Sequence, residues 1–339
     1  MQILRSGKVA IASGFLAIVF MSGCAQKVMV KALEPAEIER AAITKKIAVT
    51  DFKNDKVGLS QKVEAKIAGT TLDGKPYFTT ISRGDISKVI KEQKLQNSGL
   101  LNENDSVEVG KLVGAQALIS GAVSSTSSQD TKYTEKRTKC VDKKCKEVQE
   151  YTVPCTKRTI AMGAQIKMVD VAKGDIIYGN NMEEAKYWTH CSDDSRALPA
   201  KEQGLSTISD EIAGKFAFKL APHYIFYPVT LLEDPDLEYS EKQEKQLENA
   251  LAFIKQNRYD RGEELLADLM DQTANKSYVA IYNLGVIKEA QGQLKDAKEL
   301  YQMADKLTME PVEEINEAIN RIDAAIAKRE KALQQVAQK

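Results

Sequence analysis

The stretch Gly-Lys-Leu-Val-Gly-Ala-Gln-Ala-Leu-Ile-Ser-Gly-Ala-Val, residues 110–123, decides the fold of the first part of this chain. We expect residues 106–113 to be helical and to end at Gly114, because glycine is a common helix stop. The apolar run at residues 117–123 then predicts a strand. A helix followed at once by a buried strand indicates a sheet covered by helices.

The residues before this stretch extend the same pattern. Residues 47–49 are a short apolar run that predicts a buried strand, and residues 59–69 have the apolar spacing of a helix. Residues 77–81 predict a second strand, and Asp85 or Ser87 is expected to cap the next helix. The order strand, helix, strand, helix, helix, strand predicts a mixed β-sheet flanked by helices.

Asp51 follows the first strand, a position often used for chemistry in α/β proteins. We expect it to have a turn or capping role, because no partner residue stands at a readable spacing.

The residues after the stretch add one more half-buried strand pair. Residues 160–168 alternate apolar and polar side chains, residues 170–174 predict a turn, and residues 175–178 predict the partner strand. Apolar residues four apart then predict a helix at 205–220. The α/β domain is expected to occupy residues 45–228, with two polar, cysteine-containing hairpins inside it.

Five cysteines are present, at positions 24, 140, 145, 155 and 191. Without Cys24 the count is even, and in an exported chain this predicts two disulfides. Three pairings are possible. The four residues between Cys140 and Cys145 suit a hairpin tip, which favours that pair and leaves Cys155 for Cys191. A metal site using these thiolates and His190 is the alternative, although the spacing differs from that of common zinc knuckles.

The N-terminus predicts export and acylation. Arg5 and Lys8 precede an apolar run that is shorter than the roughly 20 residues of a membrane-spanning helix. Met-Ser-Gly-Cys at residues 21–24 resembles the lipobox of bacterial lipoproteins, which implies a signal peptide at 1–23 and lipid on Cys24. Ala25, in place of Asp, favours the outer membrane in that resemblance. Residues 24–44 are expected to be a tether that becomes helical near its end.

The C-terminal part contains a repeat. Residues 257–262 align with residues 292–297, a period of 35 that is close to the 34 of the tetratricopeptide repeat. Residues at the spacings of that repeat are expected to pack its helices, namely Leu284, Gly285, Ala297, Tyr301 and Ala304. The alternative is an unrelated helical hairpin without a binding groove.

We expect a linker at 229–245 and an all-α, tetratricopeptide-like helical array at 246–339, and the predicted fold class is therefore α+β. The last helix, at 312–338, is expected to cap the array with its first half. Its lysine-rich far end is expected to be solvated.

Five segments in order resemble the curli-production assembly/transport lipoprotein family and its holdfast-attachment relatives. They are residues 46–52, 80–83, 89–95, 110–123 and 166–171, and the resemblance spans about residues 45–225. It implies an outer-membrane lipoprotein with this α/β fold and an assembly role. The best-known members form rings whose subunits build an export channel from hairpins, which here would fall at about 124–158 and 180–198.

The sequence departs from the channel-forming pattern in its charges. A strand that faces lipid needs about 9–11 residues with alternating apolar side chains, and a basic residue at mid-bilayer costs about 2–4 kcal/mol. Residues 136–146 alone carry six basic side chains. We therefore expect water-exposed hairpins, whose basic residues are solvated or, alternatively, bind acidic glycans or lipid head groups.

The predicted function is an outer-membrane lipoprotein, facing the periplasm, that acts in the assembly or export of a surface structure. Its repeat domain would bind envelope proteins, and the chain is a candidate homo-oligomer. The alternatives are a ring-forming secretion channel and a regulator of a cell-wall enzyme. With 48 basic and 48 acidic residues, the chain lacks the positive field that nucleic-acid binding needs. We expect no enzyme, metal or cofactor beyond the lipid on Cys24, because no phosphate loop or catalytic motif is found.

Overall fold

The computed structural model describes residues 26–92 and 101–338, which divide into two compact units. The α/β unit holds the described residues of 31–226 together with 320–338, and the repeat unit holds residues 26–30 and 227–319. The expected signal peptide at 1–23 and Cys24 lie outside the described residues.

A mixed five-stranded sheet organises the α/β unit, in the order β5 (Thr79–Thr80), β2 (Lys46–Val49), β6 (Ala117–Cys140), β7 (Val148–Asp170) and β8 (Ile176–Cys191). Strand β2 runs parallel to β5 and β6, whereas β6, β7 and β8 form antiparallel pairs. This arrangement confirms the predicted α+β class with a mixed sheet.

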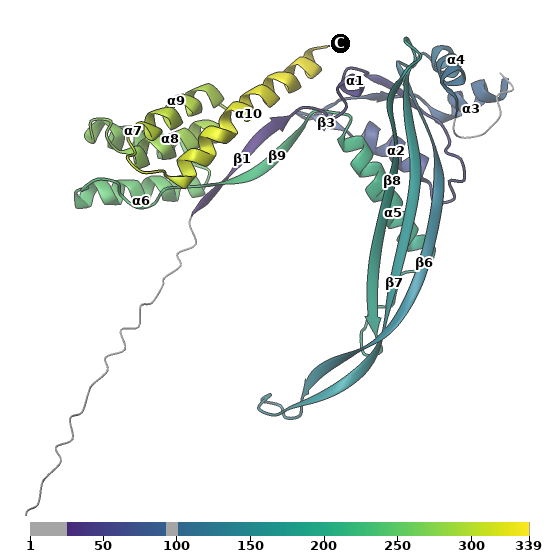
Figure 1. The fold of residues 1–339 in the computed structure, drawn as a ribbon, viewed down its shortest axis with the longest axis horizontal. Helices are drawn as coiled ribbons and strands as arrows, with labels where there is room; N and C mark the ends of the chain where they lie inside the picture. Colours follow the sequence, from purple (N-terminus) through teal and green to yellow (C-terminus); the bar gives the residue numbers. More distant parts are fainter. Residues whose placement is uncertain (1–25, 93–100, 339) are drawn as a thin grey trace, which may run out of the picture. The chain divides into compact units, whose positions relative to one another are not determined.

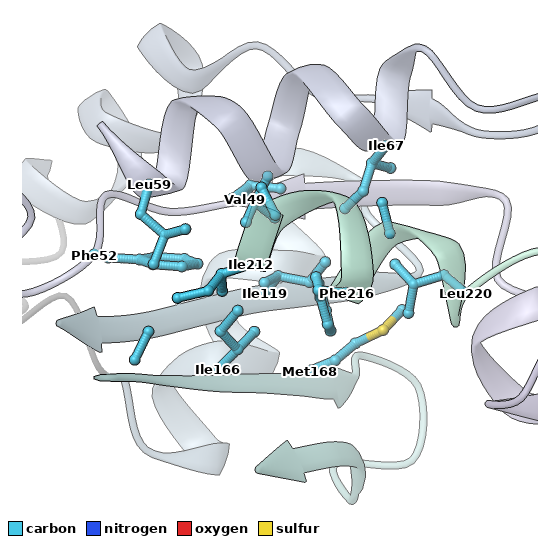
Figure 2. Close-up of a cluster of buried hydrophobic side chains, with 14 of the residues drawn as sticks. Val49, Phe52, Leu59, Ile67, Ile119, Ile166, Met168, Ile212, Phe216 and Leu220 are labelled. Carbon is cyan, nitrogen blue, oxygen red and sulfur yellow. The ribbon is translucent and has the colours of Figure 1, made fainter. Parts of the chain in front are cut away.

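Helices α2 (Leu59–Ala68) and α5 (Lys201–Phe218) cover one face of this sheet (Figure 1). Figure 2 shows their apolar side chains meeting those of the strands, among them Leu59, Ile67, Ile119, Ile166 and Phe216. Burial of each such side chain contributes about 1.5–3 kcal/mol. Gly121 is required here, because a Cβ at this position would lie 2.7 Å from the carbonyl oxygen of Gln165.

The opposite face packs against α3 (Arg83–Glu92) and α4 (Glu103–Val113) through a second cluster that includes Leu118 and Val109. Helix α4 ends at Gly114, as predicted, and that residue has a left-handed φ of 67°. Helix α4 begins earlier than expected, because the Asn102 side chain accepts a hydrogen bond from the Asp105 backbone N–H at 2.8 Å.

Two local predictions in this unit differ from the structure, and one element was not predicted. Helix α3 begins at Arg83, before both of the expected caps, Asp85 and Ser87. The strand expected at 77–81 is reduced to β5, because only Lys46 and Ile47 of the short strand β2 pair with it. The sequence reasoning missed the small hairpin of β3 (Thr71–Leu72) and β4 (Lys75–Pro76), whose turn holds Asp73 and Gly74 at positive φ.

From Lys27 onward, the expected tether at residues 24–44 is instead structured, and only its expected helical end is confirmed. Strand β1 (Lys27–Glu34) pairs with β9 (His223–Thr230), and α1 (Glu39–Ala42) follows it. Val28 and Val30 alternate into the interior with exposures of 3% and 1%. The period-2 pattern Lys-Val-Met-Val in this segment carries the strand signal.

The repeat unit contains two helical hairpins, α6 (Glu241–Lys255) with α7 (Tyr259–Gln272) and α8 (Tyr278–Ala290) with α9 (Leu294–Asp305). Their turns have the same backbone geometry. Asn257 and Gly292, which the 35-residue period aligns, both have positive φ, at 59° and 77°. The next residues, Arg258 and Gln293, share φ and ψ to within a few degrees.

Helix α10 (Glu313–Ala337) contributes its residues from 320 onward to the α/β unit. The sequence suggested that the lysine-rich end of this helix is solvated, but two of its side chains contact the N-terminal part of the chain. Gln335 is only 3% exposed, accepts a hydrogen bond from the Ala36 backbone N–H at 2.8 Å, and donates one back to the Ala36 carbonyl. Lys331 forms an ion pair with Glu39 at 3.0 Å.

Within residues 26–92 and 101–338, no helix combines the length and the apolar character that crossing a membrane would require.

Candidate functional site: a stapled ribbon

Strands β6 and β7 continue far beyond the helices that cover the sheet (Figure 1). Their pairing runs from Ala117–Asp170 in the core to Cys140–Val148 near the tip. We call residues 124–158, which comprise the outer parts of both strands and the tip between them, the ribbon. The sequence reasoning placed a hairpin here but not its length or its continuity with the core strands.

The ribbon begins at a β-bulge between Val123 and Ser125, where the buried residues of β6 end. Beyond it, β6 consists of Ser, Thr, Lys and other polar residues, most of them exposed. Threonine is β-branched and favours strands without requiring burial, so the segment stays extended in water. Bulges of this kind are common where a sheet changes course or ends its pairing.

Two disulfides staple the ribbon, and they match the pairing that the spacing favoured. Cys140 pairs with Cys145 across the tip, and Cys155 pairs with Cys191 on the neighbouring strand β8. Cys155 lies directly opposite Cys191 in the strand register. The second expected hairpin, at 180–198, is instead the strand β8 followed by a loop that leads into α5.

The Cys155–Cys191 disulfide stands at the centre of a small apolar cluster. Val153, Cys155 and Cys191 are 2–4% exposed, and Tyr133 and Tyr151 pack against them. This cluster gives the ribbon a buried centre of its own, separate from the main core.

Charged hydrogen bonds fix the turn after β8 to the ribbon. Arg137 donates to Asp193 at 2.6 Å and to Asp194 at 2.9 Å. The pKa of Asp194 is lowered, first by the backbone N–H of Cys191 and then by Arg137. The pKa of Asp193 is lowered first by the hydroxyl of Tyr151. Both carboxylates are therefore ionised, and paired with Arg137, at neutral pH.

The ribbon surface is basic. Residues 132–158 hold nine basic and four acidic side chains, a net charge of about +5. Arg158 and Asp130 pair at 2.6 Å, whereas Lys132, Lys136 and the tip lysines extend into solvent. Val141 and Val148 beside the tip are each 61% exposed. The surface is suited to contact with other molecules and carries charge on both of its faces.

The structure does not favour the alternative of a metal site. Glu135, Cys155 and Cys191 form a cluster of side chains that could in principle hold a metal ion. Both sulfurs are used in the disulfide, however, so neither is a thiolate ligand. His190 lies outside this cluster, with Nδ1 2.6 Å from the carbonyl oxygen of Arg196.

A cleft of about 610 Å³ lies between β8 and α5. Two of its cations are paired, Lys219 with Glu37 at 2.6 Å and Lys215 with Glu184. Its apolar lining residues are Tyr178, Met182 and Phe218. These side chains suit contact with an apolar group better than acid–base chemistry.

Asp51, which follows the first strand, forms an ion pair with Arg83 at 2.6 Å.

The expected packing residues of the repeat are buried. Leu284 is 6% exposed, and Ala297, Tyr301 and Ala304 are fully buried. A Cβ at Gly285 would lie 2.7 Å from the Tyr301 ring, so Gly285 allows this ring to lie between α8 and α9. Sequence reasoning missed Asn283, which is fully buried; a lone amide in an otherwise apolar helix segment was its signal.

Residues 30–133 match the model of a family described as curli production assembly/transport component CsgG. This match covers about a third of the chain and makes residues 30–133 similar to that family. The match runs from β1 into the ribbon and stops before the four paired cysteines and the repeat unit. The resemblance seen in the sequence is therefore confirmed for the first part of the α/β unit.

Three solved structures are also similar, each at low sequence identity. The NMR structure of E. coli LpoB is 10% identical, with 55% of this chain and 84% of that chain covered and a TM-score of 0.27. The PelC dodecamer from Paraburkholderia phytofirmans is 15% identical, with coverage of 57% and 97% and a TM-score of 0.24. Lipoprotein GNA1162 from Neisseria meningitidis is 12% identical, with coverage of 51% and 98% and a TM-score of 0.25. No curated protein matches the sequence.

Proposed function

We propose that this chain is a non-enzymatic, lipid-anchored protein of the bacterial envelope that helps to assemble or export a surface structure through protein–protein contacts. The match of residues 30–133 to a curli production assembly/transport component supports the assembly role. The single observation that carries the proposal is the ribbon. It extends well beyond the core, and two disulfides hold its exposed polar strands.

The edge of β6 explains why the ribbon suits protein contacts. Beyond the Lys53–Ala122 bridge, β7 is the one strand in the described structure that pairs with β6. The edge of β6 that faces away from β7 therefore presents backbone N–H and C=O groups over residues 124–140. Such an edge accepts a strand from another chain unless charges or coverage prevent pairing. The lysines along it select against apolar aggregation and favour an acidic partner segment.

The proposed location is the outer membrane, with the described units in the periplasm. An oxidising compartment accounts for two disulfides in one domain. The lipobox-like residues 21–24 and the following Ala25 support acylation of Cys24 and sorting to the outer membrane.

The N-terminal contacts would make this anchor short. The Gln26 backbone N–H donates to Glu233 at 2.6 Å, and the Leu231 N–H donates to the Gln26 carbonyl at 2.8 Å. Two residues of extended chain span at most about 7 Å. A lipid on Cys24 would therefore hold the repeat unit at the membrane surface rather than on a long tether.

A ring-forming secretion channel is the second candidate, and the strand edges favour it. Strand β8 is the outermost strand of the sheet, so it and outer β6 could pair between copies of the chain. The charges on both ribbon faces weigh against contact of the ribbon with lipid. Detergent-resistant oligomers that conduct ions across a planar bilayer would select this candidate over the first.

The test is the mass of the full-length lipoprotein in mild detergent, with co-purifying proteins identified by mass spectrometry. We expect a complex larger than one chain that contains envelope proteins. The double variant Lys132→Glu/Lys136→Glu on the ribbon should lose them. The matched variant Lys276→Glu/Lys306→Glu, with exposed lysines in the repeat unit, should retain them. A partner-free monomer, or equal retention by both variants, would refute the proposal.

A further inference from the structure

The chain covers one face of helix α8 with its own residues 227–236, which we call the strap. The strap includes the last four residues of β9 and belongs to the repeat unit, as does α8. Val229 and Leu231, two residues apart, are each 2% exposed. In extended chain, alternate side chains point the same way, so both are buried on one side of the strap.

Side chains of helix α8 bind the backbone of the strap. The Asn283 side-chain amide donates to the Leu232 carbonyl at 2.7 Å, and its oxygen accepts from the Leu232 N–H at 3.0 Å. The Tyr282 hydroxyl donates to the Thr230 carbonyl at 2.8 Å. These three hydrogen bonds recognise the main chain and therefore do not depend on which side chains the bound segment carries.

Two further contacts fix the ends of the strap. The Asp236 carboxylate accepts from the Tyr278 backbone N–H at 2.6 Å and from the Ser277 hydroxyl at 2.7 Å. It lies at the N-terminus of α8, where the helix dipole favours a negative charge. At the other end, the Tyr227 hydroxyl donates to Glu289 at 2.8 Å.

The side-chain amide on this face is costly unless a peptide backbone covers it. Asn283 is fully buried, and its side chain bonds to both backbone groups of Leu232. A buried amide without a partner costs about 1–3 kcal/mol per group. A helix face that served only as core would be apolar, so this face is suited to an extended peptide.

We propose that this face of α8 is a peptide-binding site that the strap occupies in cis, and that a partner peptide must displace the strap to bind. The ligand class follows from the strap itself. It is an extended segment with aliphatic residues at alternate positions and an acidic residue five positions after the second one. The inference concerns contacts within the repeat unit and does not depend on the ribbon.

The experiment uses the full-length chain in mild detergent and a fluorescein-labelled peptide with the sequence of residues 227–236. The double variant Val229→Ser/Leu231→Ser weakens the strap without changing α8. We expect its affinity for the peptide, measured by fluorescence anisotropy, to exceed that of the wild type at least tenfold. Adding Asn283→Ala should abolish the gain, and the control Met309→Ser, at a fully exposed site, should bind like the wild type. Equal affinity of the wild type and the strap variant would overturn the proposal.

A second measurement covers the case in which the strap variant fails to fold. Amide hydrogen exchange of the wild-type chain should show the Leu232 N–H exchanging through an opening that leaves α8 and α9 protected. Exchange of the strap amides only together with those of α8 would make the strap an inseparable part of the core, and would overturn the proposal.

Discussion

The Cys155–Cys191 disulfide should contribute most of the stability that cross-linking gives to the ribbon. The two bridges close loops of very different size, with sequence separations of 36 and 5. In the chain-entropy account of disulfides, these separations correspond to about 4 kcal/mol for Cys155–Cys191 and about 2 kcal/mol for Cys140–Cys145. Reducing the first bridge should therefore lower the free energy of unfolding by about twice as much as reducing the second.

Two variants separate the contributions without changing the side chains being compared. Cys140→Ala/Cys145→Ala, measured with and without reductant, isolates Cys155–Cys191. The reciprocal variant Cys155→Ala/Cys191→Ala isolates the tip bridge. Trp188 is the only tryptophan of the chain and packs on the buried core beside Gly204. Its fluorescence during urea unfolding therefore reports on the α/β unit.

Circular dichroism provides the internal reference, because its helical signal contains a part from α6–α9 besides the part that unfolds with Trp188. We expect the helical transition of the repeat unit to keep its midpoint when either bridge is reduced. A loss of less than about 1 kcal/mol for Cys155–Cys191, or equal losses for both bridges, would contradict the loop-size reasoning.

Three further predictions test the packing, the electrostatics and the anchor. Gly214→Ala should stabilise α5 by about 0.5–1 kcal/mol, because nothing lies within 4 Å of its added Cβ. Gly204→Ala should instead lower the free energy of unfolding by about 1–3 kcal/mol, because its Cβ would lie 2.2 Å from the side chain of buried Ile160. Urea unfolding compares the two variants, and equal effects on stability would refute the packing argument. Burial lowers the pKa of Lys45 from its ordinary 10.5 to about 8, so the folded state releases this proton before the unfolded state does. The free energy of unfolding of the wild type should therefore rise with pH between about 8 and 10.5, and Lys45→Met should lack this part of the rise. Parallel pH profiles of the two proteins would show that Lys45 is not responsible. A 12-residue Gly/Ser insertion after Ala25 adds about 20 Å of reach to the anchor. It should reduce fluorescence energy transfer from a dye on Met309→Cys to acceptor lipids in the membrane, and unchanged transfer would contradict a short anchor.

The sequence predicted the elements that local signals define. Gly114 marks the end of α4, the apolar runs mark β2 and the inner part of β6, and the aligned Asn257 and Gly292 mark equivalent turns. In each case the backbone conformation or the burial pattern depends on a few adjacent residues. The cysteine spacing favoured the observed pairs for the same reason, because the tip loop is local.

The features that the sequence missed depend on distant parts of the chain. Strand β1 needs β9, almost 200 residues away, and it was therefore predicted as a tether. Near the end of α10, Gln335 is buried because it bonds to Ala36, which helix periodicity does not show. The length of the ribbon follows from continuous pairing of polar strands, whereas hydrophobic patterning detects only strands with a buried face.

The candidate sites divide in the same way. The ribbon's cysteines and its charge were visible in the sequence, but its small apolar core around Val153 and Cys191 required the cross-strand register. The strap lies in a stretch with the composition of a linker. Its contacts with α8, among them those of Asn283 with Leu232, show that this linker is bound.

The most direct test of the account is the intact mass of the protein isolated from the membrane fraction of its native cells. We predict a chain that begins at Cys24 and carries the added mass of covalent acyl groups, with both disulfides formed. An unprocessed chain that retains Met1 and stays in the cytosolic fraction with reduced cysteines would contradict the account.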